Sequence, residues 1–250
     1  MSHIHAIGDI HGHHTELMNL YQQLLDSGMV PQRDVLVFLG DYVDGGPHTR
    51  QVLDQLIAWQ QEYPHWVFLK GNHEDLMLDA LVFNSQHYGD YYLWWSQGGR
   101  ETAQSYLPES ATDYERAIMQ PDEFISTQHL AWLGTLALMH ETDAFFFVHA
   151  GFRPGFRMEG QREEDMLWIR EGFFLARYNF GKPVVFGHTV FEEPYVVHDN
   201  RPGHEMEIVA IGINTMSRHA GALTAVTLDP DLPHAEPRFL VSDTEPEASR

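Results

Sequence analysis

Five short polar fragments follow one another along the chain, and each contains glycine within two positions of a residue that could bind a metal ion or transfer a proton. They are Gly8-Asp9-Ile10-His11-Gly12, Gly40-Asp41-Tyr42-Val43-Asp44, Gly71-Asn72-His73-Glu74, His149-Ala150-Gly151 and Gly187-His188-Thr189. Together they contain three aspartates, one asparagine and four histidines. This set has enough oxygen and nitrogen ligands for two metal ions, and one further residue remains that could act as a general acid. The combination of fragments, rather than any one of them, predicts chemistry.

The residue types indicate how such ligands would share two ions. Asp9 and His11 are two positions apart, so in an extended segment both side chains would point to the same side. Asp41 has two carboxylate oxygens and is the natural bridge between the ions. The remaining ligands, an amide oxygen and two imidazoles, would come from Asn72, His149 and His188. Because the chain has no cysteine, manganese, iron, zinc or a mixed pair fits better than calcium or an iron–sulfur centre.

One histidine is left to act as an acid. His73 is adjacent to Asn72, so it would point away from the ion that Asn72 faces. An imidazole near the ions but not bound to them could protonate a leaving alkoxide, and Asp44 could accept its other N–H and fix its tautomer. Two ions about 3.5–4 Å apart would activate a shared hydroxide and hold the oxygens of an in-line displacement.

The elements that must position these residues alternate in type. Apolar runs predict strands at 3–7, 34–39 and 65–69, and helical periodicity follows each of them, at 17–25, 49–62 and about 76–81. Three strand–loop–helix units predict a parallel sheet, which gathers ligands at the carboxyl ends of its strands. A strand is also expected at 144–148. Short strands at 184–186, 195–198, 207–211, 223–228 and 239–241 suggest a second sheet.

The alternation stops between about residues 84 and 140, where we predict a helical insertion packed over one end of the site. Its aromatic cluster, Tyr88 to Trp95, could form a platform for a nucleobase, but burial of the insertion against the sheet is the interpretation we favour. Residues 1–242 are expected to form a single domain, with 243–250 as a disordered tail.

Composition restricts the partners. Fifteen basic and 36 acidic residues give a formal net charge of −21, which disfavours a nucleic-acid partner. No apolar run approaches the roughly 20 residues that span a bilayer, and the first residues lack the features of a signal peptide, so we expect no membrane partner and a cytoplasmic location. Bound divalent cations would be the strongest local attraction for an anionic substrate. The oligomeric state is not predicted.

In order and spacing, the five fragments resemble the signatures of the metallophosphoesterase (calcineurin-like) superfamily, and within it those of the bacterial serine/threonine phosphatases of the PPP family. The resemblance implies an α/β fold of two packed mixed sheets flanked by helices. It implies a first metal held by Asp9, His11 and Asp41, and a second held by Asp41, Asn72, His149 and His188. It also implies His73 as general acid paired with Asp44, Arg170 and Asn72 as phosphate-binding residues, and direct attack by a bridging hydroxide without a phosphoenzyme.

Two positions depart from the family pattern. Gly45 stands where the family has an arginine that grips phosphate, and Asn214 stands where bacterial relatives usually have aspartate. Losing that arginine removes a contact of roughly 1.5–3 kcal/mol, for which Arg50 or Arg100 could compensate. On this basis Gly45→Arg is expected to lower KM for simple phosphomonoesters. Arg170 could instead simply stack on Trp168.

Three functions are compatible with these residues. The first is a dinuclear-metal phosphoesterase, most simply with manganese, that hydrolyses phosphomonoesters as a protein serine/threonine phosphatase does. The second is a symmetrical hydrolase of dinucleoside polyphosphates such as diadenosine tetraphosphate, since Gly45 removes bulk as well as charge. The third is a regulatory protein that binds phosphate or metal with little catalysis, which the retained general acid argues against.

Overall fold

Two mixed five-stranded sheets form the centre of the protein. The computed structural model describes residues 2–83, 88–107 and 124–242. The first sheet has the order β12-β11-β1-β2-β3. Its strands are β1 (Ile4–Ile7), β2 (Val35–Phe38), β3 (Val67–Phe68), β11 (Thr224–Leu228) and β12 (Arg238–Val241). The first three are parallel, as predicted, and β11 and β12 are added antiparallel beside β1.

The second sheet has the order β4-β5-β6-β8-β7. Its strands are β4 (Met139–Glu141), β5 (Phe146–Val148), β6 (Val184–Phe186), β7 (Tyr195–His198) and β8 (Ile208–Gly212). The strands β5, β6 and β8 are parallel, with an antiparallel strand at each edge. The suggestion that all the late strands build the second sheet is therefore wrong for β11 and β12. Both pair on the first sheet, where β1 would otherwise present an open edge.

Period-two alternation explains how the sheets pack. In β1, Ile4 and Ala6 face the second sheet, whereas Ile7 faces the opposite side. In the second sheet, Phe145 and Phe147 face the first, while Phe146 packs on the outer side. Because every residue of β1 and β5 is buried, both faces of each sheet are covered, and the apolar runs in the sequence are continuous rather than alternating.

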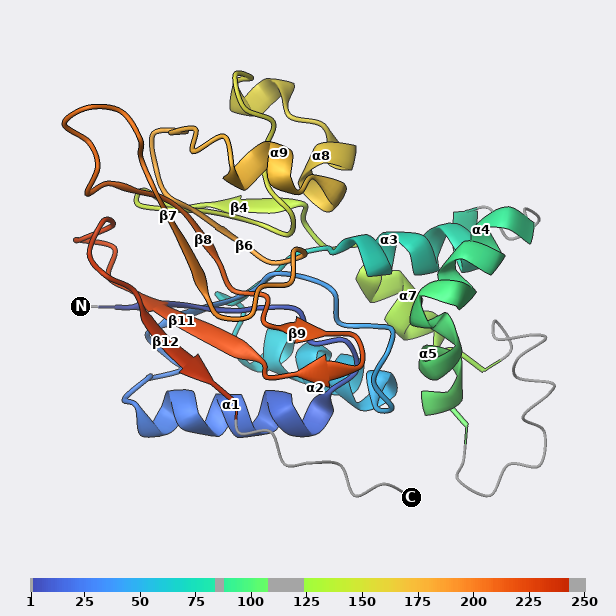
Figure 1. Cartoon of the computed structure of the whole chain (residues 1–250). Coiled ribbons are helices and arrows are strands. Elements are labelled where there is room, and N and C mark those ends of the chain that lie inside the picture. Colours follow the sequence, from blue (N-terminus) through green and yellow to red (C-terminus); the bar gives the residue numbers. More distant parts are fainter. Residues whose placement is uncertain (1, 84–87, 108–123, 243–250) are drawn as a thin grey trace.

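Helices cover both outer faces of the paired sheets, which gives the four layers seen in Figure 1. The first sheet is covered by α1 (His14–Asp26) and α2 (Thr49–Glu62), the second by α8 (Glu163–Trp168) and α9 (Glu171–Phe174). A 3-10 turn, η4 (Met158–Gly160), precedes α8. The described residues contain no helix long and apolar enough to cross a bilayer. The predicted fold class is confirmed.

The predicted insertion is helical where it is described. The helix α3 (Asn72–Leu78) continues into a π-helical turn, η1 (Asp79–Phe83), and is followed by α4 (Tyr88–Trp94), a second π-helical turn η2 (Trp95–Gly99), α5 (Arg100–Ser105) and α7 (Thr127–Leu133). These helices lie beside the ends of the sheets (Figure 1). Residues 84–87 and 108–123 of the insertion, and the tail predicted at 243–250, lie outside the described residues. The division into one domain stays a prediction.

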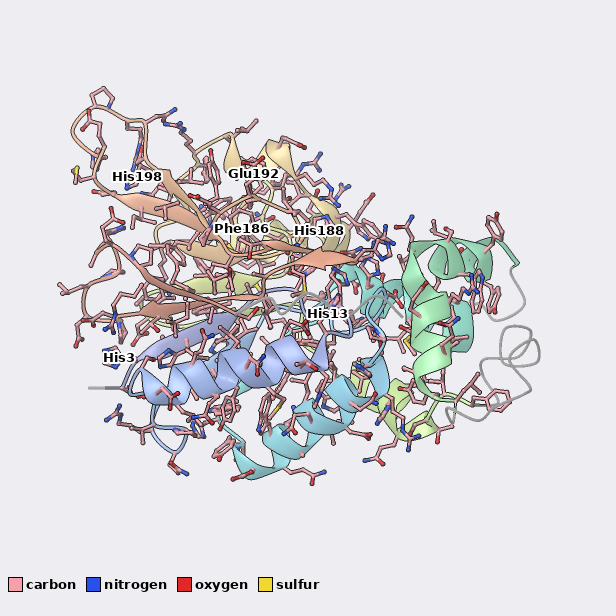
Figure 2. The ribbon with its side chains drawn as sticks, turned by 60° about the horizontal axis from the view of Figure 1, so that its bottom comes forward. His3, His13, Phe186, His188, Glu192 and His198 are labelled. Carbon is pink, nitrogen blue, oxygen red and sulfur yellow. The ribbon has the colours of Figure 1, made fainter. Side chains whose placement is uncertain are left out.

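A small hairpin, β9 (Met216–Ser217) with β10 (Ala220–Gly221), leaves the end of β8. In Figure 2, His13 at the start of α1 and His188 after β6 lie toward the centre of the view, whereas His3 and His198 lie at its left side. His3 precedes β1 and His198 ends the antiparallel β7, so both mark the amino ends of the parallel strands. The polar fragments lie at the opposite, carboxyl ends.

Candidate metal centre

The polar fragments form tight loops directly after strands. Four of their non-glycine residues have positive φ angles, namely His11 (46°), Asp41 (53°), Asp44 (71°) and His188 (59°). Non-glycine residues seldom adopt this left-handed conformation, and it is concentrated at functional sites. His11 is therefore in a turn, and the expectation that Asp9 and His11 lie on one extended segment is wrong.

Asn72, the first residue of α3, is the centre of one group of donor atoms. Its Oδ1 is 2.8 Å from His149 Nε2 and 2.8 Å from His188 Nδ1. Asp41 Oδ1 is 3.4 Å from the same His149 nitrogen. All four side chains are buried. They reach this point from the ends of β2, β3, β5 and β6, so four strands of two sheets contribute to one group.

Backbone carbonyls orient two of these imidazoles. His149 Nδ1 donates to Leu39 O at 2.9 Å, and His11 Nδ1 donates to Val43 O at 3.0 Å. Each ring therefore directs its Nε2 inward, toward Asn72 in the case of His149 and toward Asp41 Oδ2, at 3.6 Å, in the case of His11. This orientation is the one that a metal-binding histidine requires.

These donor atoms fit a metal centre. Ligand atoms about 2.1 Å from one ion are about 3.0–3.4 Å apart at octahedral or tetrahedral angles. The distances around Asn72 and Asp41, 2.8–3.6 Å, are close to that range. A cation shared by His149 Nε2 and the Asn72 oxygen would take the place of the proton between these two atoms. His188 Nε2 is also buried without a hydrogen-bond partner.

Two groups of donors are close enough to hold an ion each, and Asp41 belongs to both. One contains Asp41, His149 and His188, and the other contains His11, Asp41 and His73. This agrees with Asp41 as a bridging ligand. Asp9 belongs to neither group, and its carboxylate accepts the backbone N–H of His188 at 3.0 and 3.2 Å and the Asn214 amide at 2.6 Å. The roles of all these residues as ligands stay predictions.

Asn214, whose role the sequence leaves open, thus braces the Asp9 carboxylate. Its Nδ2 donates to Asp9, and its Oδ1 accepts the backbone N–H of Met216 at 3.1 Å. Two hydrogen bonds fix the side chain in one orientation, with the amide N–H₂ on Asp9. An aspartate at this position would place a second carboxylate against the first.

His73 and Asp44 form the predicted pair. His73 Nδ1 donates to Asp44 Oδ2 at 2.8 Å, and both residues are buried. The other carboxylate oxygen accepts hydrogen bonds from Trp94 Nε1 at 3.1 Å and from Thr102 Oγ1 at 2.8 Å. Sequence reasoning missed Trp94 and Thr102, because no short motif includes them. It was correct that the aromatic cluster mainly serves packing: Trp94 is fully buried and Tyr91 stacks on Trp95.

Glu74 braces the loops instead of facing the donor groups. Its carboxylate accepts hydrogen bonds from four backbone N–H groups, those of Asp41, Tyr42, Val43 and Gly71, at 2.7–3.2 Å. These bonds connect the loop after β2 to the start of α3. The brace therefore fixes the relative positions of Asp41 and Asn72.

The buried charges perturb one another strongly. Burial alone would lower the pKa of His149, but the carboxylates of Asp41, Asp9 and Glu74 raise it to about 9. Burial lowers the pKa of His11 and that of His188 to about 3, so both imidazoles are neutral and able to bind metal at neutral pH. Cations bound here would replace protons held between these carboxylates.

The His73–Asp44 pair also favours a bound proton. Burial opposes a charge on His73, yet Asp41 and Asp44 raise its pKa above the ordinary value. Burial likewise raises the pKa of Asp44. An imidazolium at His73, close to but distinct from the Asn72 group, suits a proton donor.

Comparison with known proteins identifies the family. The sequence model of the calcineurin-like phosphoesterase family matches residues 2–210. The chain belongs to the calcineurin-like phosphoesterase family. It is a metal-dependent phosphoester hydrolase, as the family and its phosphatase relatives support. The family depends on a dinuclear metal centre, which agrees with the two donor groups that share Asp41.

Two relatives are bacterial phosphatases. Serine/threonine-protein phosphatase 1 of Salmonella typhimurium is 30% identical over 197 residues, which are 75% of this chain and 78% of that protein. Serine/threonine-protein phosphatase 2 of Escherichia coli is 26% identical and covers 76% of this chain and 81% of its own length. The predicted resemblance to the bacterial PPP phosphatases is confirmed.

Solved structures show the same fold at lower identity. A protein named as a diadenosine tetraphosphatase superposes with a TM-score of 0.65 at 18% identity, covering 98% of this chain and 95% of its own. A protein serine/threonine phosphatase of Saccharomyces cerevisiae gives 0.61 at 13% identity, covering 99% and 81%. These likenesses concern the phosphoesterase fold alone.

The donor groups of this phosphoesterase open into a cavity of about 280 Å³. Among its lining residues are His73 and Asn72 together with two arginines, Arg170 and Arg218. Arg170, between α8 and α9, donates to the His188 carbonyl at 3.3 Å. It was expected at a phosphate-binding position, whereas Arg218 was not singled out by any motif.

Neither arginine suggested as a replacement at Gly45 lines this cavity in the part of the chain that the structure describes. Arg50 is exposed on α2 and is 3.8 Å from Asp54. Gly45 itself has a φ of 102°, and a Cβ there would lie 2.4 Å from Arg218 O. The structure argues against the expectation that Gly45→Arg would improve substrate binding, because the position lacks the backbone conformation and the space that suit a side chain.

Proposed function

We propose that this phosphoesterase hydrolyses phosphomonoesters, in the manner of a protein serine/threonine phosphatase, with two divalent metal ions. The observation that carries the proposal is the group that Asn72 forms with His149, His188 and Asp41, with the His73–Asp44 pair beside it. This arrangement supports a metal centre with a proton donor, His73, beside it. The phosphatase activity of the bacterial relatives supports the same substrate class.

Each residue has a distinct proposed role. Asp9, His11 and Asp41 hold one ion, and Asp41, Asn72, His149 and His188 hold the other. Bound ions would supply Lewis acidity that activates a water and withdraws charge from the phosphoryl group.

Arg170 and the Asn72 amide would orient the phosphoryl oxygens. His73 would then donate the proton on its Nε2 to the leaving oxygen, while Asp44 keeps Nδ1 protonated and the ring in place. Manganese suits this mixture of carboxylate, amide and imidazole ligands.

The test is hydrolysis of p-nitrophenyl phosphate by the purified chain in the presence of different divalent metals. Asp41→Asn is expected to abolish metal-dependent turnover, because the amide has one oxygen and cannot bridge two ions. Asp231→Asn, a change at an exposed position far from the site, is the matched control and should retain full activity. Near-normal turnover by Asp41→Asn would eliminate the proposed bridge.

A second candidate substrate is a dinucleoside polyphosphate such as diadenosine tetraphosphate. Trp168 is 41% exposed and lines the cavity, where its ring could stack on a nucleobase. Rates on phosphopeptides and on diadenosine tetraphosphate, measured side by side, separate the two candidates. A preference for the dinucleotide that Trp168→Ala abolishes would favour the second.

Three further expectations from the sequence stay predictions. They are a cytoplasmic location, the absence of a nucleic-acid partner and the absence of a membrane partner.

A further inference from the structure

Arg218 lies at the turn of the β9–β10 hairpin, which is formed by residues near the end of the chain. Ser217 pairs with Ala220, so the turn consists of Arg218 and His219. Arg218 is half-buried and lines the same cavity as His73, Asn72 and Arg170. A residue far from the five motifs thus brings a second guanidinium to the site.

The hairpin occupies the space that a side chain at position 45 would need. A Cβ built on Gly45 would lie 2.4 Å from Arg218 O and 2.7 Å from Arg218 Cβ. Gly45 and Arg218 are thus complementary: the absence of a side chain at one position allows the close approach of the other. The loop after β2 has glycine at position 45 instead of arginine, and the hairpin places Arg218 next to that position.

Contacts on two sides hold Arg218 in place. Its guanidinium donates a hydrogen bond to the Gln97 carbonyl in η2, and its own carbonyl is 3.3 Å from His13 Nε2. These contacts join the hairpin to the insertion and to the start of α1. A guanidinium has five N–H donors, so one bond to Gln97 leaves donors for a ligand.

The charge of Arg218 is not balanced by an acidic partner. Among the described residues, ion pairs join Arg33 to Asp34 and Arg201 to Asp199, but none involves Arg218 or Arg170. In a chain with a formal net charge of −21, two arginines without a carboxylate partner in one cavity are unusual. Guanidinium groups bind phosphoryl oxygens in a bidentate manner, so an anion is the ligand that this pair fits.

We propose that Arg218 is a substrate-binding residue that grips the phosphoryl oxygens together with Arg170, in place of the arginine that Gly45 lacks. The proposal rests on the proposed phosphoesterase function. It adds that the phosphoryl group is held by cations from two elements, the α8–α9 connection and the β9–β10 hairpin. Substrate binding then depends on the position of the hairpin, and through Gln97 on the insertion.

The test is the affinity of the manganese-loaded protein for inorganic phosphate, measured by calorimetry. Arg218→Met removes the charge but keeps an aliphatic chain, and we expect a 10- to 100-fold higher Kd for phosphate. Arg218→Lys keeps the charge without the planar fork and should give an intermediate Kd. Arg238→Met, which removes one charge on the distant β12, is the matched control and should change the Kd less than twofold.

The outcomes separate this inference from the proposed function. Manganese affinity, measured separately, should be the same in all variants, which shows that the metal centre is intact. If folded Arg218→Met binds phosphate as the wild type does, the inference is wrong even when the wild type hydrolyses phosphomonoesters. If Arg218→Met does not fold, a wild-type Kd for Arg218→Lys overturns the inference and a raised Kd supports it. Arg218-dependent phosphate binding without turnover of any phosphoester would instead overturn the function alone.

Discussion

Asp44 Oδ2 accepts a hydrogen bond of 2.8 Å from His73 Nδ1, while Asp44 Oδ1 is held by two donors from the insertion, Trp94 and Thr102. The carboxylate therefore cannot rotate without breaking three bonds. The orientation of His73 depends on residues that are distant in the chain from its own motif. This connection makes the insertion part of the proton-transfer arrangement.

Asp44→Asn should impair turnover most for substrates with poor leaving groups. The amide cannot stabilise an imidazolium, so His73 loses its advantage as an acid, which is typically worth about 10²–10⁴-fold. We expect kcat to fall about 100-fold for phenyl phosphate and less than tenfold for p-nitrophenyl phosphate, whose leaving group needs little protonation. Thr102→Val removes one donor to Asp44 and should cause a smaller loss. Equal losses on both substrates would contradict a role in leaving-group protonation.

Glu74→Gln should destabilise the protein. At least one backbone N–H would face the amide N–H₂ of glutamine and lose its acceptor, because the carboxylate accepts four such bonds. We expect the free energy of unfolding to fall by about 2–3 kcal/mol in urea denaturation. Glu163→Gln, at an exposed side chain 3.7 Å from Lys70, is the control and should cost less than about 1 kcal/mol. A Glu74 variant as stable as this control would rule out the brace.

Asn214→Ala should weaken metal binding without touching a proposed ligand. The variant removes the 2.6 Å hydrogen bond that orients Asp9, and such outer contacts typically contribute 10- to 100-fold in metal affinity. Manganese titration followed by electron paramagnetic resonance would measure the change. Asn179→Ala, which removes hydrogen bonds to Gly181, Asp199 and Glu207 and none to a proposed ligand, should leave the affinity unchanged. Identical affinities in both variants would mean that Asp9 needs no such support.

Gly45→Ala should be more destabilising than Gly28→Ala. Both glycines have nearly the same φ, 102° and 101°, so both alanines pay the same conformational penalty. Only at Gly45 would the new Cβ meet another residue, Arg218, whereas nothing lies within 4 Å at Gly28. Thermal unfolding should therefore show an excess loss of about 1–3 kcal/mol at Gly45. Equal losses of unfolding free energy at the two positions would show that the hairpin moves aside without destabilising the protein.

His5 should make stability depend on pH away from the site. Burial lowers its pKa to about 4, despite the nearby Asp34 carboxylate at 3.9 Å. The unfolded chain, with a histidine pKa near 6.5, therefore binds more protons between pH 6.5 and 4. Stability is full above pH 6.5 and falls by up to about 3 kcal/mol as the pH drops to 4. His5→Gln should flatten the unfolding free energy over this window by a similar amount, and an unchanged profile would contradict the prediction.

The sequence alone determined the features that depend on near neighbours. The apolar runs of β1 and β2, the helical periodicity of α1 and α2, and the polar residues directly after each strand all follow from local spacing. Parallel strands bring their carboxyl ends to one edge, so the meeting of Asp41 with Asn72 was predictable.

Only the tertiary structure decided the contacts between distant segments. Asn214 reaches Asp9 across 205 residues, and Trp94 reaches Asp44 across 50, in each case from an element whose position depends on packing. Likewise β11 pairs with β1 and covers its edge, and β12 pairs with β11. The residues of these two strands do not indicate which of the two sheets they join. Arg218 enters the site for the same reason: its place depends on where the hairpin packs, and on the space left by Gly45, not on any residue beside it.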